Sequence, residues 1–341
     1  MATADEEVKA ELLRVDALVA AGADPFAAFS RFLPVELLEG NGGPSTMARA
    51  ACGPDCLHLL SACLDQYGMD VNEVLSDGQT LLTVASAYSS SKCVALLLSR
   101  GANANKLGGS ARCMLASPLY FAAAHGSVAI CRQLLDAGAS LDFRCSTDMH
   151  RTPLHVAAAH ENVGVVALML NRGADARATD DALSTPIMCG IKSHIVVKAL
   201  LPHSDLTRLG SGGESLLHAT ALFGGVAVLK LVLPRYVEAG LVDLPSGPVA
   251  GKPGPFAKTP LMFAVKGGKY DEAKALLRAG ASRSIMDSNG SSALHSCIGG
   301  TSAACLELLL GDAPQWYYTP SERAESKWLQ CASSCCPWRQ C

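Results

Sequence analysis

Two histidines and a carboxylate lie close together on one apolar stretch of the sequence. The segment "RTPLHVAAAHENVGVVALMLNRGAD" contains His155, His160 and Glu161. Imidazole nitrogens and carboxylate oxygens bind divalent metals, and the same groups serve as general acid and base. A metal or catalytic site and a helix-packing motif are therefore the two competing interpretations of this segment.

A second candidate metal site lies near the C-terminus, where Cys331, Cys335, Cys336 and Cys341 could supply four thiolates to zinc. The adjacent Cys335-Cys336 pair fits zinc poorly, because zinc knuckles separate paired cysteines by two residues. We favour a tail without metal, with zinc binding and S-acylation as the alternatives. The sequence has no phosphate-binding glycine loop, His-Glu-x-x-His or Gly-x-Ser-x-Gly motif. We therefore predict no enzyme activity, no metal site and no cofactor.

Composition argues against several other classes of protein. The 341 residues are 49% hydrophobic and 17% charged, with a net charge of −3 and no Lys/Arg run longer than a pair. A nucleic-acid partner is not expected from such a charge balance. The acidic start "MATADEEVKAELL" does not resemble an export signal, and we expect no membrane span. Ten of the fourteen cysteines have no shared spacing and mostly fall at helical apolar positions, which indicates a reducing compartment, so we expect the cytoplasm, with the nucleus as the alternative.

The tetrapeptide "TPLH" at Thr152 recurs along the chain in variant form. Its relatives follow one another at intervals of 37, 35, 33, 30, 44 and 33 residues. They are "TLLT" at Thr80, "SPLY" at Ser117, "TPIM" at Thr185, "SLLH" at Ser215, "TPLM" at Thr259 and "SALH" at Ser292. Most copies are followed by an apolar pair ending eighteen residues after the Thr or Ser, and four then have a Gly-Ala step.

Each part of the repeated pattern has a mechanical role. Thr or Ser caps the N-terminus of a helix, and Pro is tolerated at the next position because its missing N–H would be unpaired there. Small residues such as "VAAA" at 156–159 let two antiparallel helices pack closely. The Gly that follows the second helix ends it in the left-handed conformation. The pattern therefore predicts a repeated pair of helices.

Seven such anchors resemble the ankyrin repeat family, over about residues 55–311. The resemblance implies an all-α solenoid of eight to nine helix-turn-helix units, joined by hairpin or loop segments called fingers. We expect residues 1–54 to form a degenerate N-terminal cap. An insertion at 238–258 lengthens one finger, and residues 312–341 form a Trp- and Cys-rich tail with a short capping helix.

The resemblance assigns His155 to structure, because this His is buried at the helix start and bonds to local backbone and the neighbouring Thr. His218 and His295 hold the same place, whereas methionine replaces them at positions 188 and 262. A metal-binding or catalytic histidine would not be exchanged in this way. His160 lies near the end of its helix on the partner-facing side. We interpret it as a solvated histidine, with partner contact as the alternative.

The function that the resemblance implies is protein binding by the concave face, as a scaffold, adaptor or inhibitor. The alternative is the substrate-targeting subunit of a larger enzyme complex, such as a ubiquitin-ligase receptor. We expect an unidentified protein partner and a monomeric chain. Family geometry nominates the partner-binding residues Tyr88, Met114, His125, Met149, Arg151, His160, Leu222, Phe223, Lys258 and Lys266.

Overall fold

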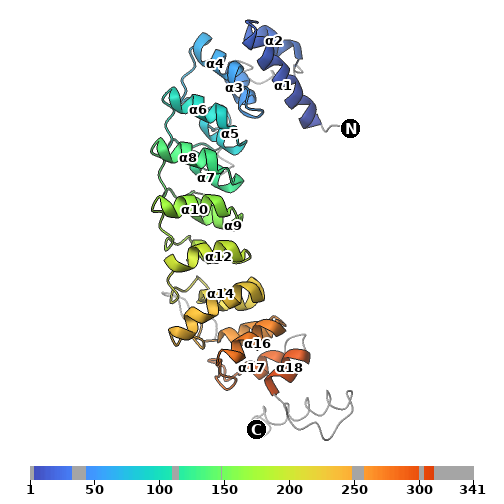
Figure 1. Ribbon diagram of the computed structural model, residues 1–341, viewed down its shortest axis with the longest axis vertical. Coiled ribbons are helices and arrows are strands. Elements are labelled where there is room, and N and C mark those ends of the chain that lie inside the picture. Colours follow the sequence, from blue (N-terminus) through green and yellow to red (C-terminus); the bar gives the residue numbers. More distant parts are fainter. Residues whose placement is uncertain are drawn as a thin grey trace, which may run out of the picture. The chain divides into compact units, whose positions relative to one another are not determined.

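A computed structural model describes residues 4–32, 44–109, 115–146, 148–247, 257–298 and 303–310. Over these ranges the chain is helical, and β structure is limited to isolated bridges at the bases of fingers. The chain divides into two compact units, Met1–Asp205 and Leu206–Cys341, called unit 1 and unit 2 below. The structure confirms an all-α solenoid built from stacked helix pairs (Figure 1).

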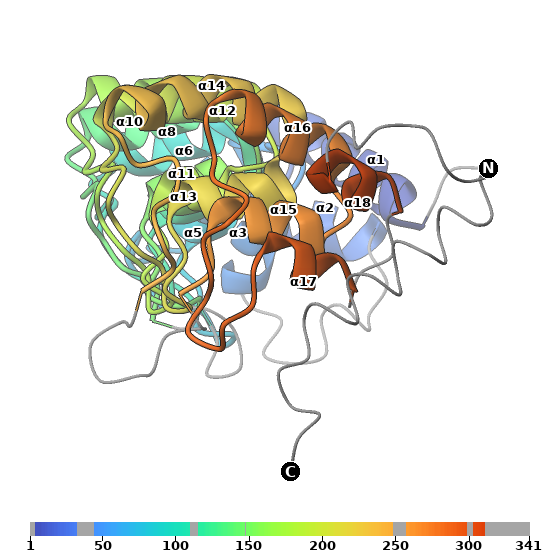
Figure 2. The ribbon, with the colours of Figure 1, turned by 90° about the horizontal axis from the view of Figure 1, so that it is seen from below.

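Unit 1 contains two layers of helices. The first helices of successive repeats, α5, α7, α9 and α11, pack against one another, and the second helices α4, α6, α8, α10 and α12 do the same (Figure 2). The helices of this unit are α1 (Ala4–Ala20), α2 (Pro25–Phe32), α3 (Pro44–Cys52), α4 (Leu57–Gln66), α5 (Leu81–Ala87), α6 (Ser91–Ser99), α7 (Pro118–His125), α8 (Val128–Asp136), α9 (Pro153–Ala159), α10 (Val163–Asn171), α11 (Pro186–Cys189), α12 (His194–Leu200) and the 3-10 turn η2 (Leu201–His203).

The helix starts and turns of unit 1 follow the predicted pattern. Ser117 caps α7 by accepting a hydrogen bond from the Tyr120 amide at 3.2 Å, and Pro118 follows it. Gly126 ends α7 with a left-handed φ of 76°, which allows the tight turn into α8. The first residues of the apolar pairs of unit 1, Leu97, Leu134 and Met169, are fully buried, and the second residues are half-buried. The first residues of the pairs therefore form part of the core between the two layers.

The N-terminal helix α1 covers one end of the second-helix layer by packing against α4. Val15 of α1 is fully buried. Asp16 accepts a hydrogen bond from the Leu59 amide at 2.8 Å, so a carboxylate from α1 satisfies a free N–H in the first turn of α4. A carboxylate at this position also interacts favourably with the positive, N-terminal end of the α4 dipole.

Unit 2 also has two layers, in which α13, α15 and α17 pack as first helices and α14, α16 and α18 as second helices. Figure 1 shows α14, α16 and α18 one after another. The elements are α13 (Leu216–Ala219), the π-helical turn η3 (Thr220–Gly224), α14 (Gly225–Glu238), α15 (Pro260–Lys266), α16 (Tyr270–Arg278), α17 (Ala293–Ile298) and α18 (Ala303–Leu310).

By length and composition alone, the apolar segment Leu216–Glu238 could cross a membrane. Gly225 breaks this segment with a φ of 72°, and α14 packs back against η3. More than half of its most apolar part is buried inside the protein. A buried core helix of a globular protein can have the same length and composition, so this segment is weak evidence for a membrane span.

The inserted finger of unit 2 is closed at its base. The Ser246 amide donates to the Lys258 carbonyl at 2.8 Å, and the Lys258 amide donates to the Ser246 hydroxyl at 2.9 Å. The Gly247 amide donates to the Gly213 carbonyl at 3.0 Å. A Cβ on Gly213 would lie 1.9 Å from the Gly247 carbonyl oxygen, so the close approach of the two backbones requires glycine. Residues 248–256 and the predicted tail at 312–341 lie outside the described residues.

The repeated histidines are structural, as predicted. His155 is fully buried, its Nδ1 lies 2.7 Å from the Thr152 hydroxyl, and its Nε2 lies 3.0 Å from the Ser184 carbonyl of the next finger. His218 repeats this arrangement with Ser215 and the Lys258 carbonyl. One nitrogen accepts and the other donates, so the neutral imidazole is fully satisfied. Burial lowers the pKa of both histidines, that of His218 to about 4.

The lowered pKa of His218 makes unit 2 sensitive to acid. The unfolded histidine binds a proton near pH 6.5 and the folded one near pH 4, so the associated stability is complete above 6.5 and is lost on acidification between these values. We expect the free energy of unfolding to fall by about 2 kcal/mol from pH 7 to pH 5 through this residue. His218→Met, which copies Met262 of the next repeat, should remove that component in urea titrations. An unchanged pH dependence in the variant would contradict this assignment.

Candidate functional site

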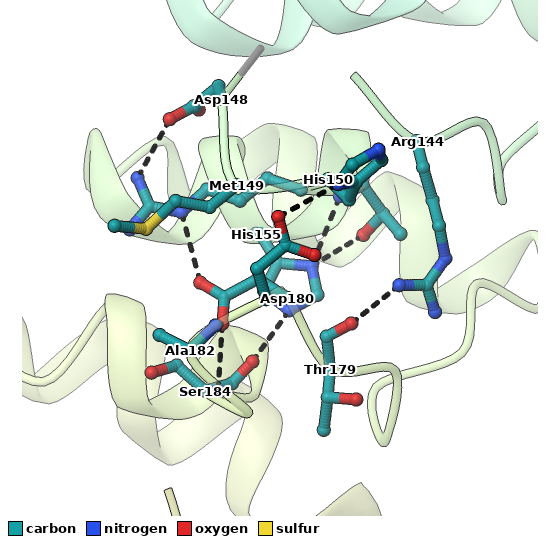
Figure 3. Close-up of polar contacts among 12 residues, drawn as sticks. Arg144, Asp148, Met149, His150, His155, Thr179, Asp180, Ala182 and Ser184 are labelled. Carbon is teal, nitrogen blue, oxygen red and sulfur yellow. Dashed lines mark hydrogen bonds and ion pairs between the residues drawn. The ribbon is translucent and has the colours of Figure 1, made fainter. Parts of the chain in front are cut away.

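Arg151 joins the fingers of unit 1. Its Nε lies 3.3 Å from Oδ2 of Asp180 in the next finger, and its Nη1 lies 3.5 Å from Oδ1 of Asp148 in its own finger (Figure 3). The Tyr120 hydroxyl of the preceding repeat donates to the other oxygen of Asp148. Burial and the bond to Asp148 raise the pKa of Tyr120, so this hydroxyl keeps its proton. These four residues, the Arg151 network, connect three consecutive repeats.

Asp180 is the buried anion of the network, with a side chain that is 0% exposed. Its Oδ1 accepts hydrogen bonds from the amides of Ala182 at 2.9 Å and Ser184 at 2.8 Å. The same Ser184 supplies the carbonyl that His155 contacts. A buried carboxylate is tolerated only when it is paired and hydrogen-bonded, and Asp180 is both. The finger 179–184 is thus fixed by its own amides and by Arg151.

The finger before α9 holds two consecutive residues in the left-handed region. Met149 and His150 have φ values of 48° and 50°, which cost energy in residues other than glycine. The Asp181 amide donates to the Met149 carbonyl at 2.8 Å, and His150 Nδ1 lies 2.8 Å from Asp181 Oδ2. These bonds across the fingers hold the strained backbone in place (Figure 3). Backbone strain of this kind is typical of functional positions. The side chain of Met149, which this strained backbone carries, is 49% exposed.

The other candidates of unit 1 lie mostly at the ends of its first helices. Tyr88 ends α5 and is 62% exposed. His125 ends α7 and His160 ends α9, and both are exposed. Because α5, α7 and α9 are neighbours in one layer, these three side chains come from successive repeats of the stack. Met114 lies outside the described residues.

The remaining candidates belong to unit 2. Phe223, in the π-helical turn η3, is 66% exposed, while Leu222 beside it is half-buried. Lys266 is the exposed last residue of α15, and Lys258 is half-buried at the base of the inserted finger. The ten nominated residues therefore divide into a group in unit 1 and a group in unit 2.

Sequence reasoning nominated Arg151 but missed the acidic partners that hold it. One signal for them exists in the spacing. Asp180 and Asp287 each stand five residues before a helix-capping Thr or Ser, and both carboxylates accept two finger amides. Aspartate commonly orders turns in this way. Only the three-dimensional stacking shows that Arg151 reaches Asp180.

Metal binding finds no support in the part of the chain that the structure describes. No group of three or more His, Cys, Asp or Glu residues there is placed to hold an ion. The nine free cysteines of these ranges are buried except Cys189, which is half-buried. Burial raises the pKa of Cys131 to about 12, so it stays a thiol. The four tail cysteines considered for zinc lie outside the described residues.

Comparisons with known proteins agree with the geometry. A model of three ankyrin repeats matches residues 106–180 and 241–316, and a model of a single ankyrin repeat matches residues 77–108. This chain belongs to the ankyrin repeat family. No curated protein sequence matches it significantly. The crystal structure of the ankyrin repeat domain of Bcl-3, a member of the IkappaB family, is similar at 22% identity and a TM-score of 0.48. The match covers 78% of this chain and 98% of that one.

The Arg151 network should contribute measurably to the stability of unit 1. Arg151→Met removes the cation from the buried Asp180, so we expect the free energy of unfolding to fall by about 1–3 kcal/mol. Asp180→Asn in the same background should recover part of this loss. Urea denaturation of the wild type, the two single variants and the double variant gives the coupling energy. Arg177→Met, at an exposed position of the same finger region, is the control, and an equal loss there would refute the network.

Proposed function

We propose that this ankyrin repeat protein is a scaffold or adaptor that binds a protein segment on one surface of unit 1. Ankyrin repeat arrays are protein-interaction modules, and the chain belongs to this class. The proposed surface consists of the described finger residues 144–146 and 148–151 and the exposed ends of α5, α7 and α9. The observation that carries the proposal is Met149, an exposed apolar side chain on a strained backbone that is fixed by hydrogen bonds.

The chemistry of this surface suits a protein partner. Exposed Tyr88 and Met149 are of the types enriched at interfaces, and apolar side chains are costly to leave in water. The ends of the first helices carry alanines such as Ala124 and Ala159, so a bound chain can approach the helices closely. The fixed finger would lose little entropy on binding.

The alternative of a substrate-targeting subunit depends on the tail at 312–341 as a second docking element, and this tail lies outside the described residues. The scaffold or adaptor role is therefore the one proposed. As part of the same proposal we place the protein in the cytoplasm. Its cysteines support this, because those described are free and mostly buried, as in a reducing compartment.

Truncation of the surface should weaken binding without unfolding the chain. After a partner is identified by proximity labelling, we expect Tyr88→Ala with Met149→Ala to reduce binding by more than about 2 kcal/mol in calorimetry, because both side chains are exposed anchors. Ile195→Ala is the matched control, since Ile195 is 48% exposed on the second-helix layer. Normal binding by the double variant, together with loss in the Ile195 variant, would place the partner on the opposite layer.

A further inference from the structure

Unit 2 carries an exposed aromatic side chain on an irregular turn. The turn η3 is π-helical over Thr220–Gly224, and Gly225 follows with a left-handed φ of 72°. Single π-turns are rare and are found frequently at functional sites. This one ends the first helix of its repeat and leaves Phe223 66% exposed. No other exposed large apolar side chain of the described residues has a higher value.

The neighbouring Leu222 is fixed against the end of α15. A Cβ on Gly267 would lie 2.7 Å from Cδ1 of Leu222 and 3.4 Å from Cγ of Lys269. Gly267 has an ordinary φ of −78°, so it is the absent side chain, rather than an unusual backbone conformation, that leaves room for Leu222 here. The end of α15 therefore brings a leucine from η3 and the aliphatic stem of a lysine together.

Two lysines border this apolar position. Lys266 and Lys269 are exposed, and neither forms an ion pair with a carboxylate in the part of unit 2 that the structure describes. Lys266 is the last residue of α15, whereas Lys269 is the N-cap of α16, so the positive end of the α16 dipole adds to the charge of Lys269. Without a carboxylate partner, both ammonium groups are available to an external anion. The whole chain has a net charge of −3 and Asp271 follows in the first turn of α16, so the positive charge here is confined to the two lysines.

We propose that Leu222, Phe223, Lys266 and Lys269, called the η3 patch, bind an acidic peptide segment of a partner protein that carries an aromatic or large aliphatic anchor. The anchor packs on Phe223 and Leu222, and flanking carboxylates pair with the two lysines. Two lysines give too little charge to hold a nucleic acid or an anionic membrane. The inference rests on the proposed scaffold function and assigns a second surface, in the other unit, with its own chemistry.

The test uses the full-length chain and a phage-displayed library of random dodecamer peptides. We expect enrichment of acidic peptides with Phe, Trp, Tyr or Leu, whose synthetic versions bind less tightly as salt is raised. Phe223→Ala should weaken their binding at least tenfold in fluorescence anisotropy. Lys266→Glu with Lys269→Glu should do the same and tests the patch without touching the aromatic ring. Tyr270→Ala and Lys230→Glu, at exposed positions of α16 and α14, are the matched controls and should bind normally.

Several outcomes would overturn the inference. These are no enrichment, enrichment of basic peptides, or acidic peptides that tolerate both η3 patch variants. Lysine-dependent binding of a single-stranded oligonucleotide or of phosphatidylserine vesicles, without peptide binding, would also overturn it. Peptides lost with Tyr88→Ala and Met149→Ala but kept with Phe223→Ala would refute the η3 patch and leave the proposed function standing. Peptides that lose binding with Phe223→Ala but bind normally to the variant with Tyr88→Ala and Met149→Ala support the η3 patch, even where the surface on unit 1 fails its own test.

Discussion

A buried hydrogen bond from the first helix of one repeat to the finger of the next links neighbouring repeats in both units. His155 contacts the Ser184 carbonyl, and His218 contacts the Lys258 carbonyl. A single repeat cannot bury its own apolar face, so stacking supplies the core and these bonds fix where the next finger begins. Both imidazoles are buried and neutral, and Nδ1 of each accepts a hydrogen bond at the start of its helix. Protonation would remove this acceptor, so the position of the fingers depends on the histidines staying neutral.

The fingers and turns that this stacking places form the candidate binding surfaces. In unit 1 the buried Asp180 and the half-buried Arg151 hold adjacent fingers together, and that connection supports the left-handed backbone at Met149 and His150. The result is an exposed thioether on a fixed support. In unit 2 a π-helical turn has a comparable effect, because it exposes Phe223 while Leu222 packs against Gly267. Local irregularity in an otherwise regular stack thus marks both candidate surfaces.

The regular part of the stack could be predicted from the sequence, because a helix cap recurs in seven copies, most of them with an apolar pair and four with a terminating Gly-Ala step. The structural role of His155 followed from its replacement by methionine in sister repeats. The Arg151 network could not be predicted, since it depends on distances between residues about thirty positions apart. The π-helical turn at Thr220–Gly224 could not be predicted either, because no part of the repeated pattern indicates it.

Site-specific photocrosslinking tests the central claim, that partners bind on the finger and first-helix side of unit 1. A photoreactive phenylalanine analogue would replace Met149 in one full-length protein and Ile195 in another, at two similarly exposed positions, one in a finger and one on the second-helix layer. Both proteins would be expressed in the same cells and irradiated. We expect a discrete crosslinked protein from position 149 and none from position 195. A crosslink from position 195 alone would contradict it.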